Sequence, residues 1–357
     1  MKMKNLLLLG AATLVVGCSQ NIVDTPEPTR HEISFSHLNS RITRTSSGFE
    51  DGANDNKDDY KLYVAISTEE HDLGTAPIAP TIESTNWFII DDIYGKTTAN
   101  GIANHPKKGP YYWLSPDVAL NFYAYAPATI EASGEPGALT IYYTVKDKAD
   151  EDFTVATPVE KLTFEKTNGT GTVNLQFYHV LSKIVISAKL SPELISAGYT
   201  IEPGYTADLT MNCKSGYMCP TTIDREWSIP VEGRVKASYA GSTSYMVLPQ
   251  NVEGNTLQIK GLIIKKNGIQ IFPSKSIASS ALNVYTLKAT DVINGEKDQD
   301  GDMEKNDGAF LPGKQYNLNI SINDLATDDG GNPVFGKELK LNAEVANWSK
   351  VSAPNLN

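Results

Sequence analysis

The chain is 357 residues long, and its composition, with 40% hydrophobic and 20% charged residues, is ordinary for a globular protein. This length predicts two domains once an export signal has been removed. The formal net charge of −11 disfavours nucleic acid and anionic lipid surfaces as partners, because their phosphates would be repelled.

The N-terminus has the pattern of an export signal. Lys2 and Lys4 precede an apolar segment at residues 5–16, which is too short to span a bilayer as a permanent helix. Gly17 and Cys18 follow this segment directly, and a small residue before a cysteine at this place is typical of a bacterial lipoprotein signal. We therefore expect cleavage before Cys18 and lipidation of its thiol, so that several acyl chains anchor the protein in the outer membrane. The alternative is an ordinary signal peptide with a chance cysteine.

Short segments with a period of two recur along the chain, and long amphipathic helical patterns are scarce, which predicts an all-β fold. The strongest segment is YYWLSPDVALNFYAYAP at residues 111–127, read as a turn followed by a strand at residues 118–126. Its aromatic residues favour a buried core strand of a β-sandwich, and the alternative is an exposed aromatic box that stacks on sugars. Other strands are expected, in chain order, at residues 33–37, 61–67, 86–93, 139–145, 173–190, 207–213, 244–248, 256–265, 270–272, 316–323 and 338–344.

The segment VNLQFYHVLSKIVISAKL at residues 173–190 is the second strong signal. A bend near residues 179–183 would let the chain cross from one sheet to another. His179 lies beside apolar residues there, which favours a structural histidine over a metal ligand. Asn267 and Gly268, between two apolar segments, predict a hairpin turn.

The run Asn-Gly-Thr-Gly at residues 168–171 predicts a flexible seam between two patterned halves. The predicted organisation is a signal peptide at residues 1–17, a polar tether at 18–30, an N-terminal β-sandwich domain at 31–170 and a C-terminal β-sandwich domain at 171–357.

Cys213 and Cys219 are the other two cysteines, in the segment NCKSGYMC, which we interpret as a short loop. An exported protein meets an oxidising compartment, so we expect a local disulfide that stabilises the fold by about 2–3 kcal/mol. A zinc site is disfavoured, because two cysteines without a nearby histidine do not supply the ligands.

The most acidic loop, at residues 296–307, resembles the start of an EF-hand. Its glycine stands too early in the pattern, and Ala309 occupies the place of the bidentate glutamate, so a solvated loop is favoured over a calcium site. A metalloprotease motif, a nucleophile elbow and a phosphate-binding loop are all absent from the sequence. We therefore expect no enzymatic activity, no cofactor and no metal.

Several landmarks together resemble the fimbrillin-like family of Bacteroidales, the type V pilin subunits. They follow the family's order over nearly the whole mature chain. They are the lipobox ending at Cys18, the first strand with Thr43-Arg44 after it, YYWLSPDVALNFYAYAP, LQFYHVLSKIVIS, YMVLPQ, LPGKQYNLNISI and the residues 345–348 near the end.

The resemblance implies two transthyretin-like β-sandwich domains that assemble into thin surface fimbriae with other subunits. A trypsin-like protease would cut after Arg41 or Arg44 and remove the first strand, and a strand from another subunit would fill the groove. The C-terminal strand is the expected donor, with an apolar row at Leu339, Leu341, Ala343 and Val345. Equally, that row could complete its own domain, since any sandwich strand shows this period.

Fimbrial subunits of this kind serve adhesion, so a host protein or glycan is a further expected partner. A different function remains open at this point, namely a cell-surface glycan-binding lipoprotein of a polysaccharide-uptake system. That function requires exposed aromatic rings. A hydrolase with scattered carboxylates is a weaker third reading.

Overall fold

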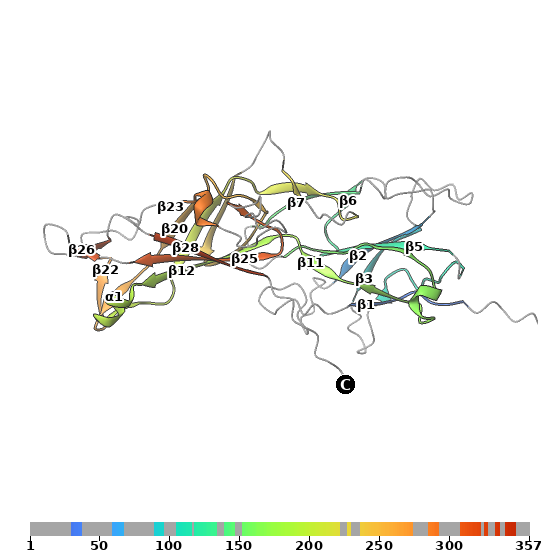
Figure 1. Cartoon of the computed structure of the whole chain (residues 1–357), viewed down its shortest axis with the longest axis horizontal. Helices are drawn as coiled ribbons and strands as arrows, with labels where there is room; N and C mark the ends of the chain where they lie inside the picture. The colour runs from blue at the N-terminus through green and yellow to red at the C-terminus, as the bar shows by residue number, and fades with distance from the viewer. Residues whose placement is uncertain are drawn as a thin grey trace, which may run out of the picture.

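The chain folds almost entirely into β-strands, which confirms the predicted fold class. The structure, a computed structural model, describes residues 30–37, 59–67, 89–95, 105–115, 118–133, 139–146, 152–221, 227–229, 236–273, 285–292, 308–322, 325–327, 333–335 and 340–347. The molecule is elongated, with the early strands gathered at one end and the late strands at the other (Figure 1). Its buried apolar side chains form two cores.

The first core lies between a large sheet and a small one. The large sheet has the order β11-β8-β5-β2-β3-β4, and β9 also pairs with β5. The small sheet consists of β1 and β10 alone. The bounds are β1 (Ser34–His37), β2 (Tyr60–Ile66), β3 (Ile90–Gly95), β4 (His105–Pro106), β5 (Leu120–Ala126), β8 (Thr154–Ala156), β9 (Val159–Leu162), β10 (Thr172–Leu175) and β11 (Phe177–His179).

The second core is enclosed by several shorter sheets. Their orders are β18-β12-β25-β28, β17-β14-β20-β23, β13-β21-β22, β16-β15-β7-β6, β19-β24 and β26-β27. The bounds are β6 (Ala132–Ser133), β7 (Thr140–Thr144), β12 (Ser182–Leu190), β13 (Tyr199–Ile201), β14 (Thr206–Met211), β15 (Ser215–Met218), β16 (Trp227–Ser228), β17 (Ala237–Ser242), β18 (Ser244–Val247), β19 (Gln250–Asn251), β20 (Thr256–Lys260), β21 (Ile264–Lys266), β22 (Ile269–Phe272), β23 (Tyr285–Thr286), β24 (Ala309–Phe310), β25 (Lys314–Ile322), β26 (Leu325–Thr327), β27 (Pro333–Phe335) and β28 (Lys340–Asn347).

Helical structure is short within the described residues. It comprises α1 (Pro192–Ser196) and the 3-10 turns η3 (Glu165–Thr167) and η5 (Ala289–Asp291). Ser191 caps α1 by accepting a hydrogen bond from the Leu194 backbone N–H. The predicted hairpin turn between β21 and β22 is confirmed, because Asn267 and Gly268 both adopt positive φ, 48° and 84°.

β5 is buried on both faces, which confirms the core-strand interpretation of the aromatic segment. Phe122 and Ala124 point into the first core, whereas Tyr123 and Tyr125 point into the second. Both cores therefore pack against one strand. The alternating pattern in the sequence predicted these two faces correctly.

The chain crosses between the cores where the sequence predicted a bend. β11 pairs with β8 at the first core, and after Val180 and Leu181 the chain continues as β12 in a sheet of the second core. The first core thus extends to Phe177, past the predicted boundary at residues 170/171. The division into two tandem domains stays a prediction.

Candidate strand-exchange site

The first strand lies between two segments that are distant in sequence. On one side, β1 pairs in parallel with β10, so that Phe35 is opposite Val173. The Ser34 backbone N–H donates to the Gly171 carbonyl oxygen at 3.1 Å, just before β10 begins. This side of β1 therefore rests on residues 171–175.

On its other side, the chain at residues 31–33 pairs with residues 111–113. The Ile33 backbone N–H donates to the Tyr111 carbonyl oxygen at 2.8 Å, and the Trp113 backbone N–H donates to the His31 carbonyl oxygen at 2.9 Å. An isolated antiparallel bridge joins the residues between these two bonds. Residues 31–37 thus occupy a slot between residues 111–113 and 171–175, which we name the first-strand groove.

Side chains of the first strand alternate between the core and the surface. Ile33 and Phe35 are 2% and 9% exposed, and the Phe35 ring lies edge-on to the rings of Tyr94 and Phe122, at centroid distances of 5.2 and 6.0 Å. Ser34 points outward, and its hydroxyl lies 2.8 Å from the Thr172 hydroxyl. Burying one isoleucine and one phenylalanine contributes about 3–6 kcal/mol, so the strand is a substantial part of the first core.

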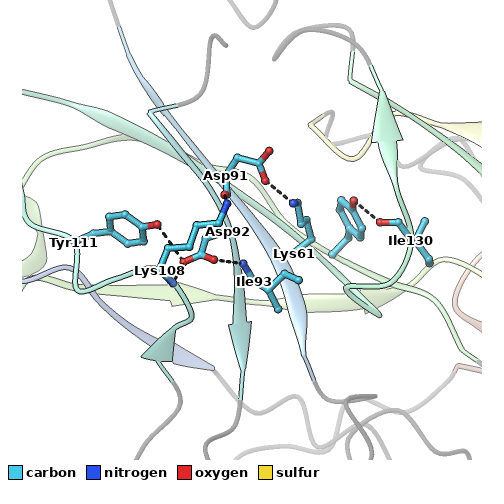
Figure 2. A network of polar contacts seen from close by, with 8 residues as sticks. Lys61, Asp91, Asp92, Ile93, Lys108, Tyr111 and Ile130 are labelled. Atoms are coloured by element: carbon cyan, nitrogen blue, oxygen red, sulfur yellow. Dashed lines mark hydrogen bonds and ion pairs between the residues drawn. The ribbon is translucent and has the colours of Figure 1, made fainter. Parts of the chain in front are cut away.

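A buried carboxylate holds the 111–113 side of the groove in place. Asp92, on β3, is 2% exposed and accepts three hydrogen bonds, as Figure 2 shows. The donors are the backbone N–H groups of Ile93 and Lys108, both at 2.7 Å, and the Tyr111 hydroxyl at 3.1 Å. The preceding residue, Asp91, forms an ion pair with Lys61. A buried carboxylate with three donors is a satisfied anchor for the loop that it holds.

The electrostatics of this anchor keep Tyr111 protonated. Burial and the hydrogen bond to Asp92 raise the pKa of the Tyr111 hydroxyl to about 12, because the phenolate would lose solvent and face a carboxylate. Near neutral pH the hydroxyl therefore remains a donor to Asp92. The carbonyl of the same residue receives the Ile33 N–H, so the anchor and the first strand are directly linked.

Gly171 lets the 171–175 side approach the first strand closely. Its φ is +70°, and a Cβ atom there would lie 2.4 Å from the Glu32 carbonyl oxygen. Only glycine fits such an approach without moving the backbone. The Gly171 carbonyl also accepts a second hydrogen bond, from the Trp113 indole N–H at 3.3 Å.

A first strand inserted into such a groove was one feature of the resemblance noted in the sequence. A family model described as fimbrillin-like matches residues 43–348. The chain belongs to the fimbrillin-like family. The family is a fimbrial one, which implies a cell-surface location and other fimbrial subunits as partners.

Solved structures share the fold of this fimbrillin-like chain. A fimbrial protein from Bacteroides vulgatus is 14% identical with a TM-score of 0.55, and the match covers 90% of this chain and 100% of that one. A candidate cell adhesion protein from Bacteroides uniformis is also 14% identical, with a TM-score of 0.52 and coverage of 91% and 100%. None of the curated proteins matches the chain.

The predicted processing residues lie outside the described residues. These are the lipidation site Cys18 and the two cleavage sites Arg41 and Arg44. The acidic loop at residues 296–307 lies outside them as well. In the part of the chain that the structure describes, no cluster of three or more histidine, cysteine or acidic side chains could hold a metal ion, and no helix is long and apolar enough to cross a membrane.

The expected donor strand pairs within its own chain. β28 is antiparallel to β25, and Leu341, Ala343 and Val345 lie opposite alternate residues of that strand. Leu339 lies outside the described residues. This pairing agrees with the alternative in which the strand completes its own domain. Its use as a donor stays a prediction.

The expected disulfide between Cys213 and Cys219 is not formed in the structure. The Cys213 thiol donates to the Ser215 carbonyl oxygen at 2.9 Å, and the Cys219 thiol lies 3.1 Å from the Thr221 hydroxyl. The segment between them is strand β15, not a loop, and it pairs with β7 and β16. At about 3.3 Å per residue the strand alone spans about 10 Å, beyond the limit of about 7 Å between Cα atoms of a disulfide.

His179 has the structural role expected from its apolar surroundings. Its Nδ1 atom is hydrogen-bonded to the Asp152 carboxylate, and the other oxygen of that carboxylate accepts the Phe153 backbone N–H at 2.8 Å. The pair lies where the chain leaves β11 for the second core. Both side chains are largely buried, so the contact fixes the crossing.

The aromatic segment does not offer a sugar-stacking box. Trp113, Phe122, Tyr123 and Tyr125 are all buried, because they pack into one or the other core. Tyr112 is the exposed ring of this segment, at 40%. The glycan-binding alternative thereby loses the four buried rings of this segment.

Three residues of the groove were missed by the sequence reasoning. Gly171 was interpreted only as part of a flexible seam, Trp113 only as one aromatic residue among several, and Asp92 was not singled out. Asp92 did carry a signal, since a period of two puts it on the same face as the apolar residues Ile90 and Tyr94. A carboxylate on a core face must have partners.

Proposed function

We propose that this protein is the precursor of a fimbrial subunit or fimbria-associated adhesin that assembles by strand replacement after proteolysis. The observation that carries the proposal is the first-strand groove. Residues 31–37 fill it, and the segment that links them to β2 contains both Arg41 and Arg44. A cut at either arginine would leave the first strand held by non-covalent contacts alone.

The physical drive for replacement comes from what an empty groove would expose. The carbonyl oxygens of Tyr111 and Gly171 would each lose a donor, and the apolar site of Phe35 would open to water. An incoming strand restores both the hydrogen bonds and the burial, as in other cases of strand addition to a sheet. While its own strand is in place, the precursor has no such site and stays monomeric.

Export as a lipoprotein is the second part of the proposal, supported by the placement of Cys18 directly after Gly17. The acyl chains would hold the precursor at the outer membrane until it is cut. Replacing Cys18 with serine should release the protein from the membrane fraction. Unchanged fractionation, with no lipid label on the wild type, would refute the anchor.

Electron microscopy of the precursor, treated with an arginine-specific protease, tests assembly, because trypsin would also cut after Lys57 in the same linking segment. We expect filaments from the wild type after cleavage, monomers before it, and no filaments from the Arg41→Ala, Arg44→Ala double variant. Arg30→Ala is the matched control, because Arg30 is exposed but precedes β1, so a cut there leaves the strand attached. Filaments from the double variant would mean that release of the first strand is not the trigger.

A further inference from the structure

We infer that Trp113 is a positioning residue that ties the two sides of the first-strand groove together and thereby slows the departure of the first strand. The inference deepens the proposed function and rests on it, since it concerns how the same groove is regulated. Trp113 belongs to one side of the groove, and its indole reaches the other side.

Trp113 makes three kinds of contact at one point. Its backbone N–H donates to the His31 carbonyl oxygen, and its indole N–H donates to the Gly171 carbonyl oxygen at 3.3 Å. Its ring, 6% exposed, lies at steep angles to the rings of Phe122 and Phe164, at 5.9 and 6.2 Å. One side chain therefore connects residues 111–113, the first strand and residues 171–175.

The Gly171 carbonyl is shared between the strand and the indole. It accepts the Ser34 backbone N–H as well as the Trp113 indole N–H, so the two donors converge on one oxygen. If Ser34 leaves, the indole bond still joins the two sides of the groove. The empty groove would then keep its width, whereas without the indole bond the two sides could separate and the strand could leave more easily.

A second ring reinforces the same corner. Phe164 stacks on the His31 ring, with centroids 3.9 Å apart and planes at 19°, while it also lies against Trp113. His31, the first residue of the paired segment, is thus covered by an aromatic face. Trp113 and Phe164 together hold the start of the first strand, at the end opposite to the arginines where cleavage is proposed.

The test is hydrogen–deuterium exchange of the Ile33 and Ser34 amides in the uncut chain. Trp113→Phe keeps an aromatic ring and removes the indole N–H, and loss of one such bond should speed exchange at these two amides about five- to tenfold. Trp227→Phe is the matched control, because the Trp227 indole N–H also donates to a backbone carbonyl, that of Val180 at 2.6 Å, in the second core. It should leave the two amides unchanged.

A milder variant covers the case in which Trp113→Phe does not fold. Phe164→Leu leaves the indole bond in place and removes the ring behind it, so it should speed exchange of the same amides by a smaller factor, about two- to fivefold. If neither folded variant speeds exchange beyond the Trp227→Phe control, the inference is wrong.

The exchange measurement separates this inference from the proposed function, because it needs neither protease nor a second subunit. Faster exchange in Trp113→Phe, without filaments from any cut protein, would support the role of Trp113 and refute strand-replacement assembly. Filaments from the cut wild type, with unchanged exchange in Trp113→Phe, would support the assembly and refute the role of Trp113.

Discussion

The strands β1 and β28 come from opposite ends of the chain and are held in very different ways. β1 has four residues and pairs along its length with the four residues of β10, in a sheet of two strands. β28 has eight residues and pairs with β25, which itself pairs with β12. β1 is therefore an added element at the edge of the first core, whereas β28 is an integral part of a sheet.

The surroundings of the two strands support this contrast. Removing β1 leaves the large sheet of the first core with all of its strands. Removing β28 would strip one side of β25, whose residues Tyr316 and Leu318 are fully buried in the second core. We therefore expect the first strand to be exchangeable and the last strand to be needed for folding.

Truncation should show the largest difference between the two strands. A chain that ends at residue 338 loses β28, and we expect its melting temperature to fall by about 10 °C or more, or the second core not to fold. A chain that begins at residue 38 loses β1, and it should keep its fold but self-associate through the empty groove. Thermal melting and size-exclusion chromatography measure both outcomes.

The opposite result of the truncations would mean that β28, and not β1, is the strand that the fold can lose. If the chain that lacks β28 folds as a monomer and melts near the wild-type temperature, the strand is dispensable. In that case its role as a donor, through Leu341, Ala343 and Val345, would gain support.

Two glycine variants test how closely the first strand fits its groove. Gly169 and Gly171 both have positive φ, +73° and +70°, so alanine at either position should cost about 1 kcal/mol of backbone strain. A Cβ atom at Gly171 would also collide with the Glu32 carbonyl, whereas one at Gly169 meets nothing within 4 Å. We expect Gly171→Ala to cost about 2–4 kcal/mol in urea unfolding, against about 1 kcal/mol for Gly169→Ala.

Equal costs for the two alanine variants would contradict the close approach of Gly171 to the first strand. The excess cost of Gly171→Ala should also disappear in the chain that begins at residue 38, since Glu32 is absent from it. Measuring both alanine variants in both chains assigns the excess cost of Gly171→Ala to contact with the first strand, and not to backbone strain at residue 171.

The smallest expected effect is an alkaline dependence at Tyr111. Its pKa of about 12 in the folded chain exceeds the value of about 10 for an unfolded tyrosine. The neutral hydroxyl therefore stabilises the fold fully below about pH 10, and this contribution is lost as the pH rises toward about 12. Tyr111→Phe should be less stable by about 1–2 kcal/mol at pH 8, and the two unfolding curves should converge near pH 12.

Tyr285→Phe is the matched control for this pH dependence. Burial and hydrogen bonds to Asp291 raise the pKa of Tyr285 to about 12 as well, but this residue packs against the second core. The control should show the same convergence and leave the first strand as tightly bound as in the wild type. If the Tyr111→Phe difference does not shrink at high pH, the hydroxyl is not the group that titrates.

Strands with strict alternation were predictable from the sequence, because a period of two is a local property. β5 and β25 lie close to their predicted positions, and the bend at His179 marks a real crossing. β15 was missed, because Lys214, Ser215 and Gly216 read as a loop although Met218 packs in the core. Pairing with β7, a distant segment, decides its conformation.

The groove could not be predicted, because its two sides meet only in the folded chain. The sequence marks residues 31–37 as a strand but does not say that residues 111–113 and 171–175 flank it. The parallel pairing of β1 with β10 joins residues far apart, and the fit at Gly171 depends on where the Glu32 carbonyl lies. Such contacts are set by tertiary structure, which local periodicity does not encode.

The crossing between the cores has a mechanical consequence. From β10 through β12 the backbone is nearly continuous strand, and the connecting residues Val180 and Leu181 are fully buried. An extended strand already spans about 3.3 Å per residue, close to the limit of the chain, so it has almost no slack. When the molecule is pulled along its length, this segment bears the tension. It lengthens only after its hydrogen bonds to neighbouring strands have broken.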